Sequence, residues 1–163
     1  MKKHKAPGDD PGKGSYRNEA PQSTSGRGED YELIDSGDGR KFERFGRYRL
    51  IRPCAQAIWR PQGGDSLWAQ ADASFDRTHG NRWRLHRPLP QEWVVTVSGM
   101  RFKLSPTDFG HLGIFPEQKD LWDWITRMVE KARDRRVGQV SVLNLFAYSG
   151  GATMAAARAG ARV

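Results

Sequence analysis

The stretch VSVLNLFAYSGGATMAAARAGARV, residues 140–163, decides the fold of this chain. Apolar residues crowd its first seven positions on both faces, which is typical of a strand buried in a parallel sheet. Gly150 and Gly151 then turn the chain, and a run of small, helix-favouring residues follows and ends at a glycine. We therefore predict a strand over 140–146 and a helix over 151–159. Together they form the first βα unit of a doubly wound fold, whose ligand crevice lies at the carboxyl ends of the strands.

The two glycines of the turn suit a ligand that approaches the backbone closely. Glycine accepts backbone angles that other residues avoid, and it places no side chain between the main chain and a ligand. The surrounding residues contain neither the Gly-x-Gly-x-x-Gly of dinucleotide enzymes nor a Gly-Lys-Ser/Thr ending, so the pattern does not indicate a phosphate site. A nucleoside without phosphates fits the turn better.

Two blocks of sequence resemble a known family. NLFAYSGG, residues 144–151, resembles motif I of the class I S-adenosylmethionine (SAM) methyltransferases, in the branch that includes ribosomal RNA methyltransferases of the large subunit. FGHLGIFPEQ, residues 109–118, resembles the segment just upstream of motif I in that branch, which carries a Gly-x-Phe-x-(Asp/Glu)-Gln pattern beside the cofactor. The resemblance covers residues 31–163.

The resemblance implies SAM as the cofactor and a set of residues that bind it. These are Asn144, Phe146, Tyr148, Gly150, Gly151, Phe115 and Gln118. Phe115 has an alternative role as a hydrophobic staple, a residue that precedes a helix and packs back on its first turns. In the family, an acidic residue after the second strand and an Asp-Pro-Pro or Asn-Pro-Pro loop complete the site, and neither is in this sequence. We therefore expect an N-terminal part of a longer enzyme, without catalytic residues of its own and inactive alone.

The composition favours a nucleic-acid partner. The formal net charge is +8, which suits RNA, although a basic balance also serves solubility alone. Cys54 is the only cysteine, so we expect a reducing compartment, the cytoplasm, and a packing role for this thiol. His111 has no ligand partner at a metal spacing, and no run approaches the roughly 20 apolar residues of a membrane span. The sequence does not indicate an oligomeric state.

The rest of the chain divides into three parts. Residues 1–30 contain little besides Tyr16 as a large apolar group and are predicted to be a disordered basic tail. Residues 31–104 are predicted to form a small β-rich domain, whose clearest hairpin joins 93–97 to 100–104 through Ser-Gly. A second hairpin is expected between 68–75 and 83–87. The domain's tryptophans stack RNA bases in one hypothesis and fill its core in the other, which we favour.

Residues 105–163 are predicted to begin the methyltransferase domain, with a long helix over 116–136. Pro116 suits a first helical position, and acidic residues complement the positive end of the helix. Apolar residues then recur at helical spacing and predict one continuous apolar face, which would cover one side of the sheet. Its members are Leu121, Trp124, Ile125, Met128, Val129 and Ala132.

The predicted fold class is α/β, or α+β overall: a small β-rich domain followed by the start of a Rossmann-like SAM methyltransferase domain, truncated after its first βα unit. The first functional hypothesis is a SAM-dependent methyltransferase that modifies ribosomal or other RNA. The alternative is a non-catalytic basic RNA-binding module. A nicotinamide-dependent oxidoreductase is a third hypothesis, and the missing glycine pattern disfavours it.

Overall fold

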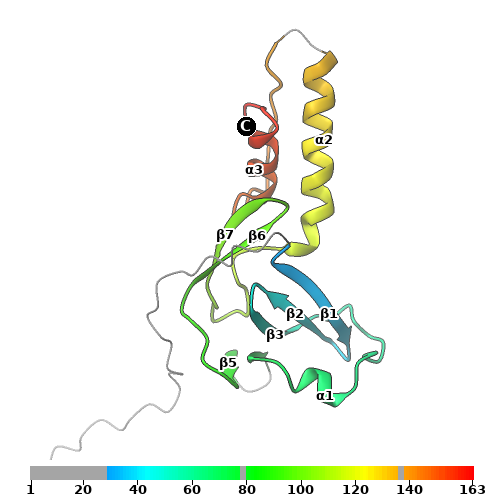
Figure 1. Ribbon diagram of the computed structural model, residues 1–163, viewed down its shortest axis with the longest axis vertical. Coiled ribbons are helices and arrows are strands. Elements are labelled where there is room, and N and C mark those ends of the chain that lie inside the picture. The colour runs from blue at the N-terminus through cyan, green and yellow to red at the C-terminus, as the bar shows by residue number, and fades with distance from the viewer. Residues whose placement is uncertain (1–28, 78–79, 136–137) are drawn as a thin grey trace, which may run out of the picture.

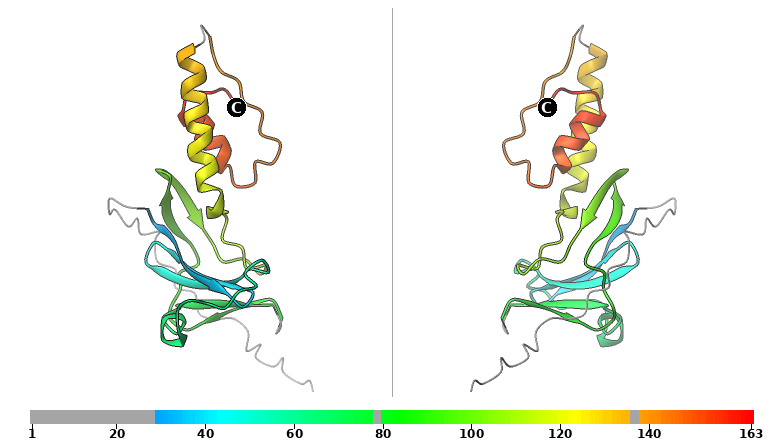
Figure 2. Two further views of the ribbon diagram at one scale, coloured as in Figure 1. Left: turned by 90° about the vertical axis from the view of Figure 1, so that its right-hand side faces the viewer. Right: turned by 90° about the vertical axis from the view of Figure 1, so that its left-hand side faces the viewer.

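The computed structural model describes residues 29–77, 80–135 and 138–163. A five-stranded sheet lies at one end, a separate two-stranded hairpin follows it, and helices α2 and α3 lie side by side at the other end (Figures 1 and 2). The strands are β1 Tyr31–Gly37, β2 Arg40–Phe45, β3 Tyr48–Pro53, β4 Ala73–Asp76, β5 Arg82–Leu85, β6 Trp93–Val97 and β7 Met100–Leu104. The helices are α1 Asp65–Trp68, the 3-10 helix η1 Pro116–Gln118, α2 Lys119–Arg135 and α3 Gly151–Arg158.

The sheet has the order β1-β2-β3-β4-β5, and its strands are antiparallel except for one pair. β3 and β4 run parallel, with Leu50 opposite Ala73 and Ile51 opposite Ser74. A parallel pair needs a crossover connection, and the segment that contains α1 supplies it. The predicted hairpin between 68–75 and 83–87 is therefore shorter than expected, because Trp68 ends α1 instead of starting a strand.

The hairpin of β6 and β7 confirms the clearest local prediction. Val97 lies opposite Met100, and the two turn residues Ser98 and Gly99 have φ of 49° and 65°. Positive φ at both positions is the mark of the primed turns that match strand twist. Alternate residues of β6 are buried as predicted, which places Trp93, Val95 and Val97 in the core.

One hydrophobic core joins the sheet, the hairpin and the helices. The ring of Tyr48 in β3 meets Trp93 at 5.2 Å, and Phe102 in β7 stacks on Trp122 of α2 at 5.3 Å. Apolar side chains from residues 31–104 and 105–163 are thus buried against each other. The division of the chain into two domains at this point stays a prediction.

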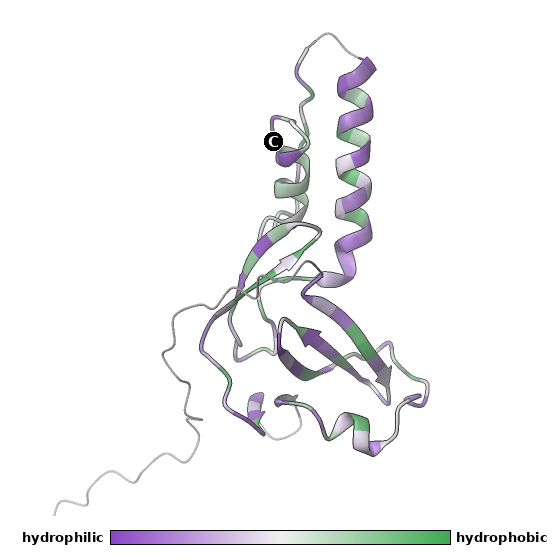
Figure 3. Cartoon of the chain, in the orientation of Figure 1, coloured by the Kyte–Doolittle hydropathy of each residue, from purple (hydrophilic) through white to green (hydrophobic). Residues whose placement is uncertain are grey.

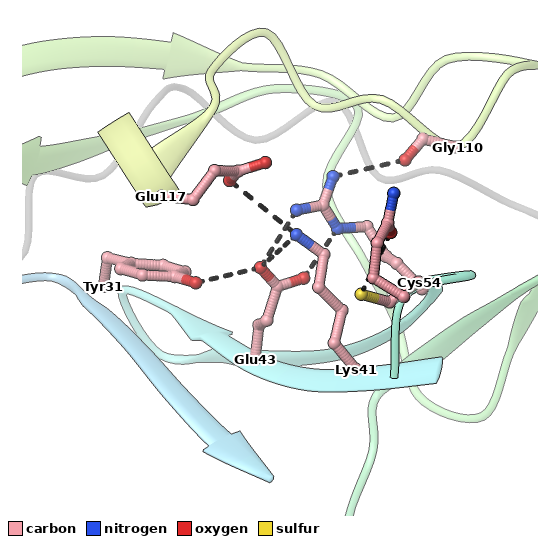
Figure 4. Close-up of polar contacts among 8 residues, drawn as sticks. Tyr31, Lys41, Glu43, Cys54, Gly110 and Glu117 are labelled. Carbon is pink, nitrogen blue, oxygen red and sulfur yellow. Dashed lines mark hydrogen bonds and ion pairs between the residues drawn. The ribbon is translucent and has the colours of Figure 1, made fainter. Parts of the chain in front are cut away.

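A buried ion pair holds the middle of the sheet (Figure 4). The Glu43 carboxylate is 0% exposed and accepts two hydrogen bonds from Arg52, from Nε at 2.8 Å and from Nη2 at 3.0 Å. It also accepts the Tyr31 hydroxyl at 3.1 Å and lies 3.1 Å from Nζ of Lys41. Burial, followed by the Glu43 charge, raises the pKa of Tyr31 above its usual value, so that hydroxyl stays a donor.

The ion pair also reaches the 109–118 block. Nη1 of Arg52 donates to the carbonyl of Gly110 at 3.4 Å, and Lys41 lies 3.8 Å from the Glu117 carboxylate. Strands β2 and β3 therefore fix the segment that precedes α2. The free thiol of Cys54 lies beside this cluster, half-buried, and its proposed packing role stays a prediction.

The long helix begins at Pro116 as predicted, as a 3-10 turn that continues into α2, but only part of its predicted apolar face is buried. Hydrophobic and hydrophilic residues alternate along α2 (Figure 3), and its apolar residues divide between a buried and an exposed stripe. One stripe packs on α3 and the hairpin and contains Trp122, which the prediction had left out, together with Ile125 and Val129. The other stripe is exposed and contains Leu121, Trp124 and Met128. The helix therefore buries one side of the predicted face and not the other.

The predicted strand over 140–146 is also wrong. Ser141 makes an isolated parallel bridge with Arg162. Among the described residues of this segment, the bridge does not extend into a ladder of paired strands. Val140 and Val142 pack on α2 and α3, whereas Leu143, Leu145 and Phe146 are 82%, 74% and 92% exposed. A strand needs neighbours that accept its backbone hydrogen bonds, and one bridge does not make a ladder.

Most of the predicted tail, residues 1–28, lies outside the described residues. The last two residues of the predicted tail, Glu29 and Asp30, are ordered, contrary to the prediction. The backbone N–H of Asp30 donates to the carbonyl of Thr96 at 3.0 Å, and its carboxylate accepts the N–H of Thr96 at 2.8 Å. The Glu29 carboxylate accepts the N–H of Ser98. These bonds attach the chain to the hairpin just before β1.

Candidate cofactor-binding site

The predicted glycine turn is a sharp bend between the 140–146 segment and α3. Tyr148 has φ of 46° and Gly150 has φ of 90°, so both lie in the left-handed region. The N–H of Gly150 donates to the carbonyl of Ala147 at 2.7 Å, and α3 begins at the next residue. A left-handed tyrosine is uncommon and costs on the order of 1 kcal/mol, which points to a functional constraint at this turn.

Gly150 leaves its side of the turn open. A Cβ atom built on this residue meets no protein atom within 4 Å. The backbone of the turn is therefore accessible to a flat ligand, as the sequence indicated for a glycine at this position.

The two resembling blocks meet through their aromatic side chains. The ring of Phe115 lies 4.6 Å from that of Tyr148, centroid to centroid, and His111 packs edge-on against Phe115 at 5.8 Å. Phe115 stands directly before η1, and the N–H of Gln118 closes this turn on the Phe115 carbonyl at 3.0 Å. The fold thus brings the rings of Phe115 and Tyr148 together, and Gln118 lies in the turn that follows Phe115. His111 has no metal partner in the sequence, and its ring contact with Phe115 arises only in the fold.

Asn144 stabilises the turn through two side-chain hydrogen bonds. Its Nδ2 donates to the hydroxyl of Thr153 on α3 at 2.9 Å, and its Oδ1 accepts the N–H of Phe146 at 3.2 Å. Both amide ends are engaged, so the segment before the turn is tied to the helix after it. Thr153 was not predicted, because only the tertiary structure brings these two residues together.

Gly151 has a different role from its neighbour. A Cβ built on it would lie 2.5 Å from the indole of Trp122, so the glycine allows α3 to pack closely on α2. Gly151 is buried, and Trp122 is 2% exposed. The structure therefore places one predicted site glycine in the helix interface and the other on the open side of the turn.

Charges beside the site gather at the start of α2. A hydrogen bond to Asp123 and the nearby carboxylates, Glu29 among them, raise the pKa of Lys119. Burial would raise the pKa of Asp123, but hydrogen bonds, with Lys119 as one donor, hold it below its usual value. Both groups are charged at neutral pH, and Lys119 also lies 4.0 Å from the Glu29 carboxylate, which links the start of α2 to the residue that bonds the hairpin.

The donor set suits an organic cofactor. Two rings, one open backbone turn and amide groups are the features that hold a nucleoside. In the described part of the chain, no cluster of His, Cys, Asp or Glu is arranged to hold a metal ion. None of its helices has both the length and the apolar character for crossing a membrane.

Comparison with known proteins agrees with this geometry. A SAM-dependent methyltransferase from Agrobacterium tumefaciens has a solved structure that is 41% identical to the chain, with a TM-score of 0.72 over 90% of it. The chain is related to the SAM-dependent methyltransferases. The relationship confirms the predicted fold class, a Rossmann-like methyltransferase fold with a β-rich part before it. The chain spans 46% of the Agrobacterium structure.

Two further matches extend the comparison. "Ribosomal RNA large subunit methyltransferase K/L" of Shewanella amazonensis is 40% identical over 73 residues, which are 44% of this chain and 9% of that protein. A putative methyltransferase solved in complex with SAH shares the fold at 16% identity, with a TM-score of 0.56 over 82% of this chain and 36% of that structure. No protein-family model matches the chain.

Proposed function

We propose that the protein is a SAM-dependent methyltransferase that acts on RNA and binds SAM at the turn from Asn144 to Gly151. One observation carries the proposal. The left-handed turn of Tyr148 and Gly150, open on one side, meets the ring of Phe115 from the second resembling block at 4.6 Å. The relatedness to SAM-dependent methyltransferases supports SAM as the ligand.

The residues divide the work of binding. Gly150 leaves the backbone free for close approach, and the rings of Phe115 and Tyr148 pack on the adenosine. Gln118 would hydrogen-bond the nucleoside, and the exposed Phe146 would cover it. Asn144 positions the turn through Thr153. Gly151 acts through helix packing, so we assign it a positioning role.

SAM supplies an activated methyl group when bound, so the protein's contribution is mostly the alignment of the nucleophile with that group. We assign no catalytic residue within this chain. The net charge of +8 and the name of the Shewanella relative support RNA, and ribosomal RNA in particular, as the substrate. With ribosomal RNA as the proposed substrate, we also propose the cytoplasm as the location of the protein.

Replacing Gly150 by alanine should weaken SAM binding at least tenfold, or by about 1.4 kcal/mol. The added methyl group meets no protein atom, so its steric effect falls on the ligand. The measurement is calorimetric titration of the full-length protein with SAM.

Gly39→Ala is the matched control. Gly39 also has a positive φ, 73°, and open space around its Cβ position, but it lies in the β1–β2 turn. Both variants carry the same kind of left-handed strain, of about 1–2 kcal/mol. Unchanged SAM affinity in Gly150→Ala, or an equal loss in Gly39→Ala, would remove the turn from the proposed site.

A further inference from the structure

A groove of about 390 Å³ runs across the outer face of the five-stranded sheet, on strands β2 to β5. The half-buried Ile51 and Pro53 of β3 contribute apolar surface to it. Arg40 of β2 lines one side, and Arg84 of β5 and Arg77 line the other. None of these residues belongs to the proposed SAM site.

Strand register explains why these side chains share one face. Residues directly opposite each other in a sheet point to the same side. Arg84 lies opposite Ser74, and Ser74 lies opposite Ile51. Arg40 lies opposite Pro53, which is two residues from Ile51 and so points the same way.

The groove collects arginines that have no carboxylate partner. Elsewhere on this sheet Arg44 pairs with Glu32 and Arg52 with Glu43, and beside the sheet Arg87 pairs with Asp72. Within the described residues, Arg40, Arg77 and Arg84 form no ion pair, and all three are exposed. The lining contains these three arginines and one acidic residue, Asp76, so the groove is positively charged.

Arg40 is held in place. Its guanidinium lies 5.0 Å from the centre of the Trp68 ring, which stacks on Phe42 at 5.6 Å. The indole N–H of Trp68 donates to the Asp35 carboxylate at 2.8 Å. A side chain fixed in this way loses little conformational freedom when it binds an anion. Arg40 also lines a second cavity of about 360 Å³, whose charged side chains are two arginines and two aspartates, so the excess of positive charge belongs to the groove.

We propose that this groove binds single-stranded RNA, with Arg40, Arg77 and Arg84 on the phosphates and the Ile51–Pro53 surface against the bases. Guanidinium groups match the geometry of phosphates. Single-stranded RNA exposes its bases, which can then lie against an apolar surface, whereas a duplex keeps its bases stacked in its interior. The inference rests on the proposed function, since it supplies a site for the RNA substrate. The contacts to phosphate carry no sequence preference.

The test compares two triple variants of the full-length protein. The groove variant is Arg40→Gln, Arg77→Gln and Arg84→Gln, and the control is Arg101→Gln, Arg127→Gln and Arg135→Gln, three exposed arginines away from the groove with the same change in net charge. Fluorescence anisotropy of labelled oligouridine is measured over a range of salt concentrations. The groove variant should bind at least tenfold more weakly, and its log–log salt slope should fall by roughly 2, at about 0.7 for each phosphate contact. The control should lose less than threefold.

Three outcomes would overturn the proposal: equal losses in both triple variants, no loss in the groove variant, or tighter binding of a duplex than of oligouridine by the unmodified protein. The double variant Arg77→Gln with Arg84→Gln leaves the contact between Arg40 and Trp68 intact. It replaces the triple variant in the same binding measurement if the triple variant does not fold. SAM titration of the same samples separates the two proposals. A protein that binds RNA through the groove but no SAM contradicts the proposed function and not the groove.

Discussion

Replacing Glu43 by leucine should lower the free energy of unfolding by about 3–5 kcal/mol. The change removes the carboxylate that pairs with Arg52 and leaves that guanidinium buried without its partner. The Tyr31 hydroxyl loses its acceptor as well. Urea denaturation followed by tryptophan fluorescence measures the effect.

Glu32→Leu is the control for this prediction. Glu32 also pairs with an arginine across two strands, but its side chain is 57% exposed, so the loss should stay below about 1 kcal/mol. The double variant Glu43→Leu with Arg52→Met should recover more than half of the loss, because removing both charges ends the penalty of an unpaired one. Equal stability of Glu43→Leu and the unmodified protein would contradict the buried pair.

The second large effect is expected at Gly151. Gly151→Ala should lower stability by about 1–3 kcal/mol, the usual cost of overpacking a core. Alanine is normally preferred over glycine in a helix, by up to about 1 kcal/mol, so the sign depends on the clash with Trp122. That clash is severe, because the new Cβ would lie 2.5 Å from an indole that stacks on Phe102. Thermal unfolding measured by circular dichroism tests the sign.

The alanine variants of Gly150 and Gly151 should differ in two measured quantities, the stability of the fold and the affinity for SAM. Gly151→Ala should lose stability while its folded fraction keeps SAM affinity within about threefold, and Gly150→Ala should lose affinity with a smaller loss of stability. An increase in stability of Gly151→Ala would show that α3 does not pack on Trp122 as described. A large loss of SAM affinity in a stable Gly151→Ala protein would move this glycine back into the cofactor site.

Local sequence determined the elements whose signals lie within a few residues. The Ser-Gly turn and the alternating residues beside it specified the hairpin of β6 and β7, because turn type and a period of two are local properties. Pro116 marked the start of the long helix, and the small residues after Gly151 marked α3. The two family-like blocks indicated the methyltransferase relationship before any fold was known.

The tertiary structure decided what depends on distant neighbours. Strand pairing placed Arg52 beside Glu43, and the parallel match of β3 with β4 brought Arg84 to the same face as Arg40. No local pattern encodes strand order, so the buried ion pair and the groove were invisible in the sequence. The apolar pattern of residues 140–146 suggested a strand. A strand forms only where neighbouring strands accept its backbone hydrogen bonds, and in the described residues this segment has one bridge. The two glycines look alike in sequence and differ because Trp122 packs against only one of them.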